Sequence, residues 1–449
     1  MNAFDAFFQD APAAVDVPAV RRDWQALNGA YNVNQWLLPL PPWAKRPYEH
    51  AGGEAWRLLQ TDLAQNDSES PMCIYLHAPF CSSKCGFCDC YSFKLGARQR
   101  EHIQQYVDRL CYELCLWSAL GSLKRRPIAS VHLGGGTPTF LGAAALEQLA
   151  DCCKAHFNIT PTTEWALESN STALTPEVID AMHRIGYRRL HLGVQTLQDP
   201  VRSTIGRRRS AADMLQKIET TLALGWVVSV DLICGLPGQT LAGFIAGLQA
   251  LLAAGIDGVS LYELLIYPQN YKWARRHGLT ERGHESNFWM FVAGAHLLEA
   301  HGLRKNLFNH WAGARDANVY FTFPQRGEDL LAVGTIADGV FGDYHYRHPR
   351  YTPYMETALF GAPGLQGGLR RNPLEERVKP LATPVLSGRL SAEIARAIEA
   401  QSGLVTRWQA FGLLRADAAG GFWLTPSGSW FAGNMVAEVT AALAEPQPA

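Results

Sequence analysis

Residues 72–90 read Met-Cys-Ile-Tyr-Leu-His-Ala-Pro-Phe-Cys-Ser-Ser-Lys-Cys-Gly-Phe-Cys-Asp-Cys. The first five residues are apolar and rich in strand formers, which predicts a buried strand. Four cysteines then follow within ten residues, and Cys81, Cys85 and Cys88 have C-x3-C-x2-C spacing. A cubane iron–sulfur cluster has four irons that each prefer a thiolate, so three cysteines leave one iron open to a substrate or cofactor. The stretch predicts a strand that leads into a cluster-binding loop.

Two other uses of these cysteines compete with a cluster. A zinc site usually takes two ligand pairs, and no second cysteine pair follows at a suitable spacing, although Cys90 could complete a four-thiolate site. Disulfides suit secreted proteins, whereas residues 1–10 are acidic and lack the basic start of a secretory signal. Ten cysteines in 449 residues suit a reducing compartment. We therefore expect a cytoplasmic protein with a cluster rather than structural zinc or disulfides.

The bulk composition excludes two classes of partner. The net charge is −1, with 40 basic and 41 acidic residues, so no basic face for nucleic acid is expected. No uninterrupted apolar run is long enough to cross a bilayer, and we expect no membrane association. A chain of 449 residues is long enough for two or three domains.

The pattern along the chain predicts an α/β protein in three parts. Residues 1–70 are irregular, with a proline-rich stretch at 38–43, and indicate an N-terminal extension with short helices and a linker. Apolar strands and amphipathic helices then alternate, which is typical of βα units and a parallel sheet. With five or six such units, residues 71–360 are expected to form a partial or full (β/α) barrel and a segment that shapes the substrate pocket. The chemistry of such folds gathers at the carboxyl ends of the strands.

The last part, residues 361–449, has a different pattern. A helical stretch at 390–400 precedes glycine-flanked apolar segments at 412–414 and 420–428, which indicates a small winged-helix-like domain. Its neutral charge argues against DNA binding. We expect it to cap the barrel.

Polar residues follow the predicted strands, where an active face is expected. Residues 134–139 read Gly-Gly-Gly-Thr-Pro-Thr directly after a strand, and such glycines expose backbone N–H groups to a carboxylate or phosphate. Glu168, Gln195 and Asp231 lie at or near other strand ends, where acidic groups could hold hydroxyls or an ammonium. Arg207 could clamp a carboxylate, or belong to a solvated basic run with its neighbours.

As a set, these motifs resemble the radical S-adenosylmethionine (SAM) family that contains oxygen-independent coproporphyrinogen III oxidase. The resemblance covers about residues 72–240. It rests on the cysteine loop and the strand before it, on Gly134–Pro138, Gly193-Val-Gln195 and Arg207, and on the segment Asp231-Leu-Ile-Cys-Gly-Leu-Pro-Gly-Gln239.

The resemblance implies a role for each matching residue. Cys81, Cys85 and Cys88 would ligate a [4Fe-4S] cluster, and Cys90 would lie beside it as a non-ligand that carries hydrogen or a proton. The family binds two SAM molecules side by side. The residues implied around them are Tyr75, Phe87, Gly135, Gly136, Thr137, Glu168, Gln195, Arg207 and Asp231.

The segments at 261–268 and 308–320 are more similar to the class C methyltransferase branch of the family, including its heme-utilisation members. We therefore expect methylation or cyclopropanation of an sp2 carbon in an aromatic, natural-product or tetrapyrrole substrate. A low-potential donor of the flavodoxin or ferredoxin type would supply electrons. His310 and Tyr262 are the candidate catalytic residues of this half, although either could instead be a packed wall residue.

Three other functions stay open at this point: radical decarboxylation of coproporphyrinogen, stoichiometric heme binding by a chaperone, and a zinc-binding structural role.

Overall fold

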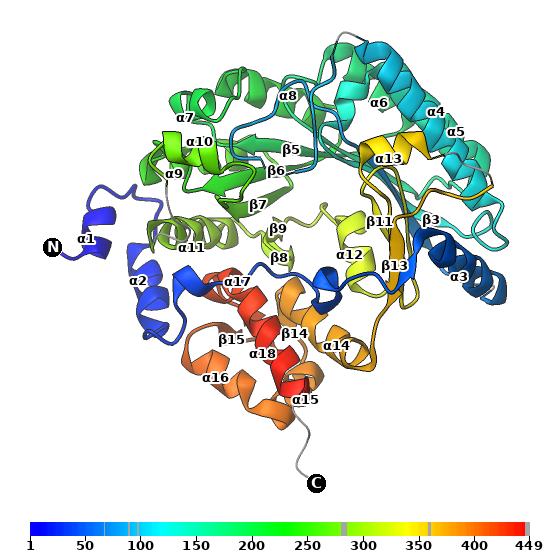
Figure 1. Ribbon diagram of the computed structural model, residues 1–449. Helices are drawn as coiled ribbons and strands as arrows, with labels where there is room; N and C mark the ends of the chain where they lie inside the picture. Colours follow the sequence, from blue (N-terminus) through cyan, green and yellow to red (C-terminus); the bar gives the residue numbers. More distant parts are fainter. Residues whose placement is uncertain (67, 89, 97, 280–284, 358–360, 445–449) are drawn as a thin grey trace.

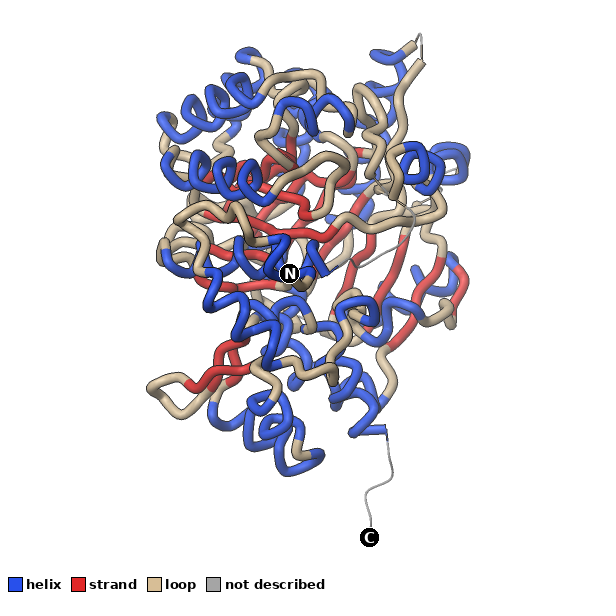
Figure 2. Tube along the Cα trace, turned by 90° about the vertical axis from the view of Figure 1, so that its left-hand side faces the viewer, coloured by secondary structure: helices blue, strands red, loops and turns tan. Residues whose placement is uncertain are grey.

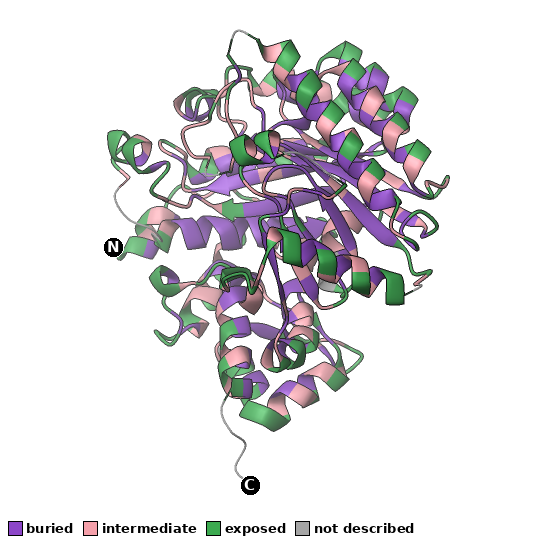
Figure 3. Ribbon diagram, turned by 45° about the vertical axis from the view of Figure 1, so that its right-hand side comes forward, coloured by how far each residue is buried: buried purple, intermediate pink, exposed green. Residues whose placement is uncertain are grey.

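The computed structural model describes residues 1–66, 68–88, 90–96, 98–279, 285–357 and 361–444, and in this part of the chain 13 strands form one large sheet (Figure 1). Seven neighbouring strands are parallel. In sheet order they are β10 (Leu330–Val333), β2 (Met72–Ala78), β3 (Ile128–Gly135), β4 (Glu164–Ser169), β5 (Arg189–Gln195), β6 (Val227–Cys234) and β7 (Gly258–Glu263). Strands covered on both faces need apolar residues throughout, which explains their near-continuous burial (Figure 3).

Helices cover the outside of the parallel strands, as βα connections require. The long ones are α4 (Gln99–Ser118), α5 (Ala143–His156), α6 (Pro176–Ile185), α8 (Ala211–Ala223), α9 (Leu241–Ala253) and α11 (Glu285–Ala300). Shorter helices near the strand ends are η3 (Pro138–Leu141), α7 (Asp199–Thr204), α10 (Tyr271–Arg276) and α13 (Tyr351–Glu356). The expected partial (β/α) barrel is confirmed.

Antiparallel strands extend the sheet beyond its parallel part at both sides. On the β10 side lie β11 (Asp338–Phe341), β12 (Tyr344–Arg347), β13 (Gly367–Arg370) and β1 (His50–Ala51). On the β7 side lie β9 (His310–Ala312) and β8 (Arg304–Leu307). The described strands do not close into a ring, and α12 (Val319–Gln325) packs against β2 and β3 from the inside.

The C-terminal part forms a helical layer below the barrel, which Figure 2 shows from the side. Its helices are α14 (Pro373–Ser387), α15 (Ala392–Ser402), α16 (Leu404–Ala410), α17 (Pro426–Trp430) and α18 (Ala432–Ala444). The expected helix and hairpin are present, because β14 (Arg389–Leu390), β16 (Phe422–Leu424) and β15 (Leu414–Ala416) pair in that order. In the described ranges we find no helix that is both long and apolar enough to span a bilayer.

The N-terminal part wraps around both layers. It contains α1 (Ala3–Phe7), α2 (Val17–Ala26), η1 (Val33–Gln35), η2 (Pro42–Lys45) and α3 (Gly52–Gln65). The helix α11 is buried nearly all round, because α2 and α17 cover the side that faces away from the barrel.

Residues 36–43, named here the strap, run between the barrel and the C-terminal helices (Figure 1). The strap is tied to α18, since the Leu37 backbone N–H donates to the Asn434 side chain at 2.8 Å. Gly433 is required at this crossing, because a Cβ there would lie 2.1 Å from the Leu37 carbonyl oxygen. Trp36 packs on Trp430 with ring centroids 5.8 Å apart. The strap is therefore held in place by the C-terminal part of the chain.

Candidate active site

A pocket lies at the carboxyl ends of the parallel strands, where the barrel pattern places chemistry. It brings together the four cysteines of the loop and polar residues from β3 to β6. The expected residues that line it are Cys81, Cys85, Phe87, Cys88, Cys90, Gly135, Gly136, Thr137, Glu168, Gln195, Arg207 and Asp231. We call it the cysteine pocket. Residues up to 150 positions apart in the chain thus meet because parallel strands end at one edge.

The cysteine loop packs closely on the glycine-rich turn after β3. A Cβ on Gly136 would lie 2.8 Å from the Phe80 carbonyl oxygen and 3.1 Å from the Cys81 sulfur. The Cys81 sulfur is also 3.4 Å from the Thr137 hydroxyl oxygen. Only glycine leaves room for this contact, so the turn and the loop form one wall.

Three thiols on one pocket wall fit a [4Fe-4S] cluster. Cys81, Cys85 and Cys88 all line the cysteine pocket. Burial raises the pKa of the Cys85 thiol, Arg207 opposes this shift, and Cys88 and Cys81 add to it. Among the described residues, no group of three or more His, Cys, Asp or Glu side chains is arranged to hold a single metal ion. A cubane takes one thiolate at each of several irons, and the spread of Cys81, Cys85 and Cys88 is compatible with that.

The outer part of the loop is fixed by the short helices of the barrel top. The Asn270 side chain donates to the Phe87 carbonyl at 2.9 Å. Gly86 is pressed against the indole of Trp273, where a Cβ would lie 2.1 Å from a ring atom. These contacts aim the Phe87 ring into the pocket, 5.8 Å from the Arg207 guanidinium.

Glu168 supplies a fixed negative charge to the cysteine pocket. Its carboxylate accepts from the Gly135 N–H at 3.1 Å and lies 3.3 Å from Nε2 of His132. Burial alone would raise the pKa of Glu168, but His132 and the Gly135 N–H outweigh it and lower the pKa. An ionised carboxylate in this place can bind hydroxyls or an ammonium.

Gln195 and Arg207 show the marks of a binding site rather than of packing. Gln195 has φ of 67° at an irregularity between β5 and β6, a backbone conformation that costs energy in a residue with a side chain. The Nε of Arg207 is buried and, in the described part of the chain, has no hydrogen-bond partner. Such an orphaned donor fits a ligand carboxylate.

Tyr75 is the one expected SAM residue that does not line the cysteine pocket as described. Its hydroxyl bonds to His77 at 2.9 Å, and its ring stacks on Tyr320 at 5.1 Å. It lies beneath Gly134, whose missing side chain leaves room for the phenol ring. The direct contact between Tyr75 and SAM stays a prediction.

A second, larger cavity of about 390 Å³ lies beside the cysteine pocket. All three parts of the chain build its walls: the strap, the inner strands of the barrel, and α14. Its lining is mostly apolar and aromatic, with Leu40, Trp43, Leu307, Phe308, Phe321, Val340 and Leu386. We call it the strap cavity. Residues 39–43 of the N-terminal extension form one wall of the strap cavity.

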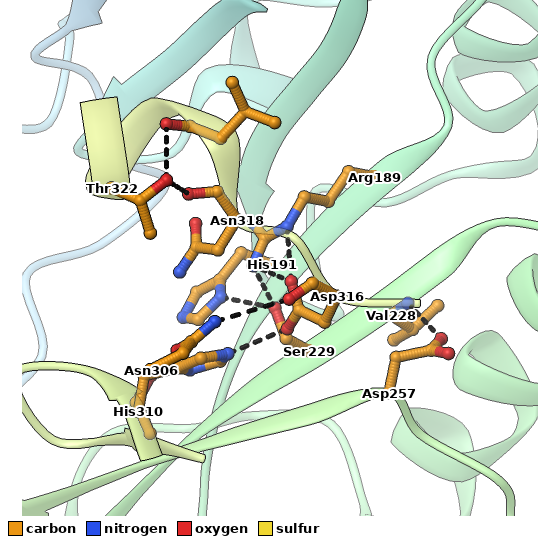
Figure 4. Close-up of polar contacts among 12 residues, drawn as sticks. Arg189, His191, Val228, Ser229, Asp257, Asn306, His310, Asp316, Asn318 and Thr322 are labelled. Atoms are coloured by element: carbon orange, nitrogen blue, oxygen red, sulfur yellow. Dashed lines mark hydrogen bonds and ion pairs between the residues drawn. The ribbon is translucent and has the colours of Figure 1, made fainter. Parts of the chain in front are cut away.

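Tyr262 and His310, the candidate catalytic residues of this half of the chain, both line the strap cavity. Tyr262 is 38% exposed and can reach a ligand. His310 is buried, with Nδ1 at 2.8 Å from the Ser260 hydroxyl. Its Nε2 lies 2.7 Å from Asp316 (Figure 4). Both ring nitrogens of His310 are therefore occupied by the protein, and the catalytic role of these residues stays a prediction.

Sequence reasoning missed His191, the residue that lines both the cysteine pocket and the strap cavity. The signal was present in β5, where Arg189, His191 and Gly193 alternate with apolar residues. A period of two places these three on the inner face of the barrel, so the polar face of an otherwise apolar strand was the clue.

Comparison with known proteins agrees with this geometry. Residues 75–251 match the family model described as the Radical SAM superfamily. Over these residues the chain is similar to that family.

Relatives and a solved structure extend the likeness. The chain is 32% identical over 197 residues to a heme chaperone, HemW, of Mycobacterium tuberculosis, covering 44% of this chain and 50% of the relative. It is 26% identical to an anaerobilin synthase of Escherichia coli O157:H7, covering 84% of this chain and 85% of the relative. The structure of coproporphyrinogen III oxidase (HemN) from Escherichia coli has the same fold, with a TM-score of 0.76, 20% identity, and coverage of 93% and 98%. The match thus spans half the length of the heme chaperone.

The expectation of a class C methyltransferase or cyclopropanase is wrong, because these relatives are described as a heme chaperone, an anaerobilin synthase and an oxidase. The segments that suggested the methyltransferase branch contain the end of β7, all of β9 and the start of α12. They shape the strap cavity and pack the barrel interior, and such wall residues do not define a reaction type.

Proposed function

We propose that this radical SAM protein acts on a tetrapyrrole bound in the strap cavity. The observation that carries the proposal is the shared wall at His191, which places a large apolar cavity directly beside the cysteine pocket. A reaction that starts in one pocket can then reach a ligand in the other without a separate channel.

The chemistry of the strap cavity suits a flat conjugated ring with carboxylate arms. Trp43, Phe308 and Phe321 offer aromatic faces to the macrocycle. Lys379 and His345 line one end of the cavity, and Nη1 of Arg371 lies 2.8 Å from Nε2 of His345. Burial, with Arg371 adding to it, lowers the pKa of Lys379, so an anionic ligand group would stabilise its charged form.

The names of the relatives support the same ligand class. They refer to heme, to anaerobilin and to coproporphyrinogen. All three names denote tetrapyrroles or their precursors and products.

In the proposed enzyme, Cys81, Cys85 and Cys88 hold a [4Fe-4S] cluster, and Arg207, Glu168, Gln195 and the glycine turn hold SAM. When bound, the cluster and SAM supply a carbon radical that abstracts hydrogen, with electrons from a flavodoxin- or ferredoxin-type donor. The chain's own residues position the ligand and exclude water. A second SAM molecule stays a prediction, which equilibrium dialysis of SAM against the reconstituted protein tests by its stoichiometry.

The second candidate is a heme carrier, which the 32% identity to the heme chaperone favours. One experiment separates the candidates. The anaerobically reconstituted protein is titrated with heme and with coproporphyrinogen, then given SAM and dithionite, and the 5′-deoxyadenosine and the tetrapyrrole are analysed by mass spectrometry.

An altered tetrapyrrole together with 5′-deoxyadenosine supports the enzyme. Loss of carbon dioxide from coproporphyrinogen identifies an oxidase, and a changed heme identifies a heme-modifying enzyme. Stoichiometric heme binding with unchanged heme supports the carrier and refutes turnover. Failure to bind either tetrapyrrole overturns the proposal as a whole.

A further inference from the structure

His191 stands between the cysteine pocket and the strap cavity and is held from both ring nitrogens. Its Nε2 lies 2.5 Å from Oδ1 of Asp231, which itself lines the cysteine pocket. Its Nδ1 lies 2.7 Å from the Ser229 hydroxyl (Figure 4). The side chain of Asp231 is 20% exposed and that of His191 is 9% exposed. A ligand in the cysteine pocket can therefore reach the partner of His191.

A buried polar network fixes the far side of this imidazole. Arg189 donates from Nη2 to the Ser229 hydroxyl at 3.0 Å and from Nε to Asp316 at 3.0 Å. Asp316 in turn bonds to His310. Figure 4 shows these side chains converging from β5, β6, β9 and the segment after β9. The Ser229 hydroxyl oxygen has two acceptor lone pairs, so it can accept from Arg189 and from a protonated His191 at the same time.

The charges around His191 favour its protonated form. Burial alone would lower the pKa of His191, but the Asp231 carboxylate, through its charge and its hydrogen bond, raises it above the ordinary value, with Glu168 adding and Arg189 opposing. The titratable and charged groups that face it from neighbouring elements are His132 on β3, Glu168 on β4, Arg189 on β5, Asp231 on β6, Tyr262 on β7, His310 on β9 and Asp316. Asp231 is the nearest of the negative groups.

SAM competes with His191 for that carboxylate. SAM carries a sulfonium, an ammonium and ribose hydroxyls, and each of these is attracted to an ionised Asp231. A cationic SAM beside a cationic imidazole also costs electrostatic energy in a buried site. Both effects favour the neutral imidazole once SAM is bound.

We propose that His191 and Asp231 couple the occupancy of the cysteine pocket to the charge of the wall that it shares with the strap cavity, so that binding of SAM releases the His191 proton. The inference rests on the proposed SAM site. One N–H bond of the imidazolium breaks, and the proton passes to solvent. Imidazolium becomes imidazole, and no electrons are exchanged. Coupling of this kind is reciprocal, so protonation of His191 weakens SAM binding by the same factor.

The test measures protons released on SAM binding by calorimetry of the cluster-reconstituted protein, in two buffers with different ionisation enthalpies. The wild type is expected to release up to one proton more than His191→Gln, since glutamine keeps a polar side chain but does not titrate. Below the His191 pKa, the SAM affinity of the wild type is expected to increase by up to about tenfold for each unit by which the pH is raised. The affinity of His191→Gln should not change with pH in this way.

Two further variants keep the test sharp. His296→Gln removes a histidine on α11 that also pairs with an aspartate, Asp23 at 2.7 Å, but lines neither pocket, and it is expected to behave as the wild type. Ser229→Ala leaves His191 titratable but removes the Nδ1 acceptor, so the rise in affinity is expected to move to lower pH.

Equal proton release in the wild type and His191→Gln overturns the coupling. Thermal melting checks that each variant is folded, and if His191→Gln is unfolded, an unmoved slope in Ser229→Ala overturns the coupling instead. Because no tetrapyrrole is present in this measurement, its failure is separate from the failure of the proposed tetrapyrrole function.

Discussion

Arg189 and Asp316 form an ion pair inside the barrel, with 3.0 Å between guanidinium and carboxylate and side chains only 2% and 0% exposed. The pair ties β5 to the segment after β9, across a distance of 127 residues in the chain. The ion pair also joins the polar contacts of the two histidines, because Arg189 donates to Ser229, the partner of His191, and Asp316 bonds to His310.

Asp316→Asn is expected to destabilise the protein by about 3–5 kcal/mol, because Arg189 would stay buried without its counter-charge. Denaturant unfolding followed by circular dichroism measures the change. The control is Asp343→Asn, which breaks the exposed pair with Arg370 and should cost less than about 1 kcal/mol. If both variants lose the same free energy of unfolding, Arg189 is not left with a buried, uncompensated charge in Asp316→Asn.

Replacing Cys81, Cys85 or Cys88 by alanine is expected to abolish the cluster, because each thiolate is assigned its own iron. Cys90→Ala should keep it. Iron and acid-labile sulfide after anaerobic reconstitution are the measurement, and Cys153→Ala, at a buried position on α5, serves as a control. A cluster that survives without Cys85 but not without Cys90 would reassign the ligands.

Gly136→Ala is expected to lower both iron content and SAM binding, since the new methyl group would push the Phe80 carbonyl and the Cys81 sulfur apart. Gly53→Ala is the matched control, because a Cβ there meets nothing within 4 Å at the start of α3. Full cluster loading and SAM binding in Gly136→Ala would show that the glycine turn and the cysteine loop have room for a methyl group between them.

Lys379→Gln is expected to weaken tetrapyrrole binding about tenfold, the loss of one charge-assisted contact of roughly 1.5 kcal/mol. Fluorescence quenching of the cavity tryptophan by added heme gives the affinity. Lys124→Gln, at an exposed position outside the cavity, should change nothing. An unchanged affinity in Lys379→Gln would show that no carboxylate of the tetrapyrrole binds to Lys379.

Burial, with Arg371 and Lys379 adding to it, lowers the pKa of His345 to about 3. The unfolded chain takes up this proton near pH 6.5, so the unfolded state binds more protons between pH 6.5 and pH 3. The contribution of His345 to stability is complete above pH 6.5 and is lost as the pH falls through that window.

In wild type relative to His345→Gln, the free energy of unfolding should therefore fall by up to about 1.4 kcal/mol per pH unit below pH 6.5. Urea unfolding at a series of pH values measures the difference. Parallel pH profiles for the two proteins would show that His345 is not buried in its neutral form.

Much of the barrel could be predicted from local pattern. The segments 189–194 and 227–234 match β5 and β6 almost to the residue, because apolar residues recur there at least at every second position, as the helix-covered face of a strand requires. Most of the cysteine pocket was also predictable, since Glu168, Gln195 and Asp231 lie at or near the carboxyl ends of strands, whereas His191 was missed. Tyr75 does not line this pocket, because its ring packs under Gly134 and its hydroxyl bonds to His77.

The sequence by itself determined the cluster loop, the parallel barrel and the edge where they meet, because these depend on spacing within short segments. Only the tertiary structure decided that the strap, the barrel interior and α14 enclose one cavity, and that His191 borders both pockets. Those contacts join residues hundreds of positions apart, and no local pattern encodes which distant side chains meet. The substrate side of this protein is for that reason a property of the folded chain.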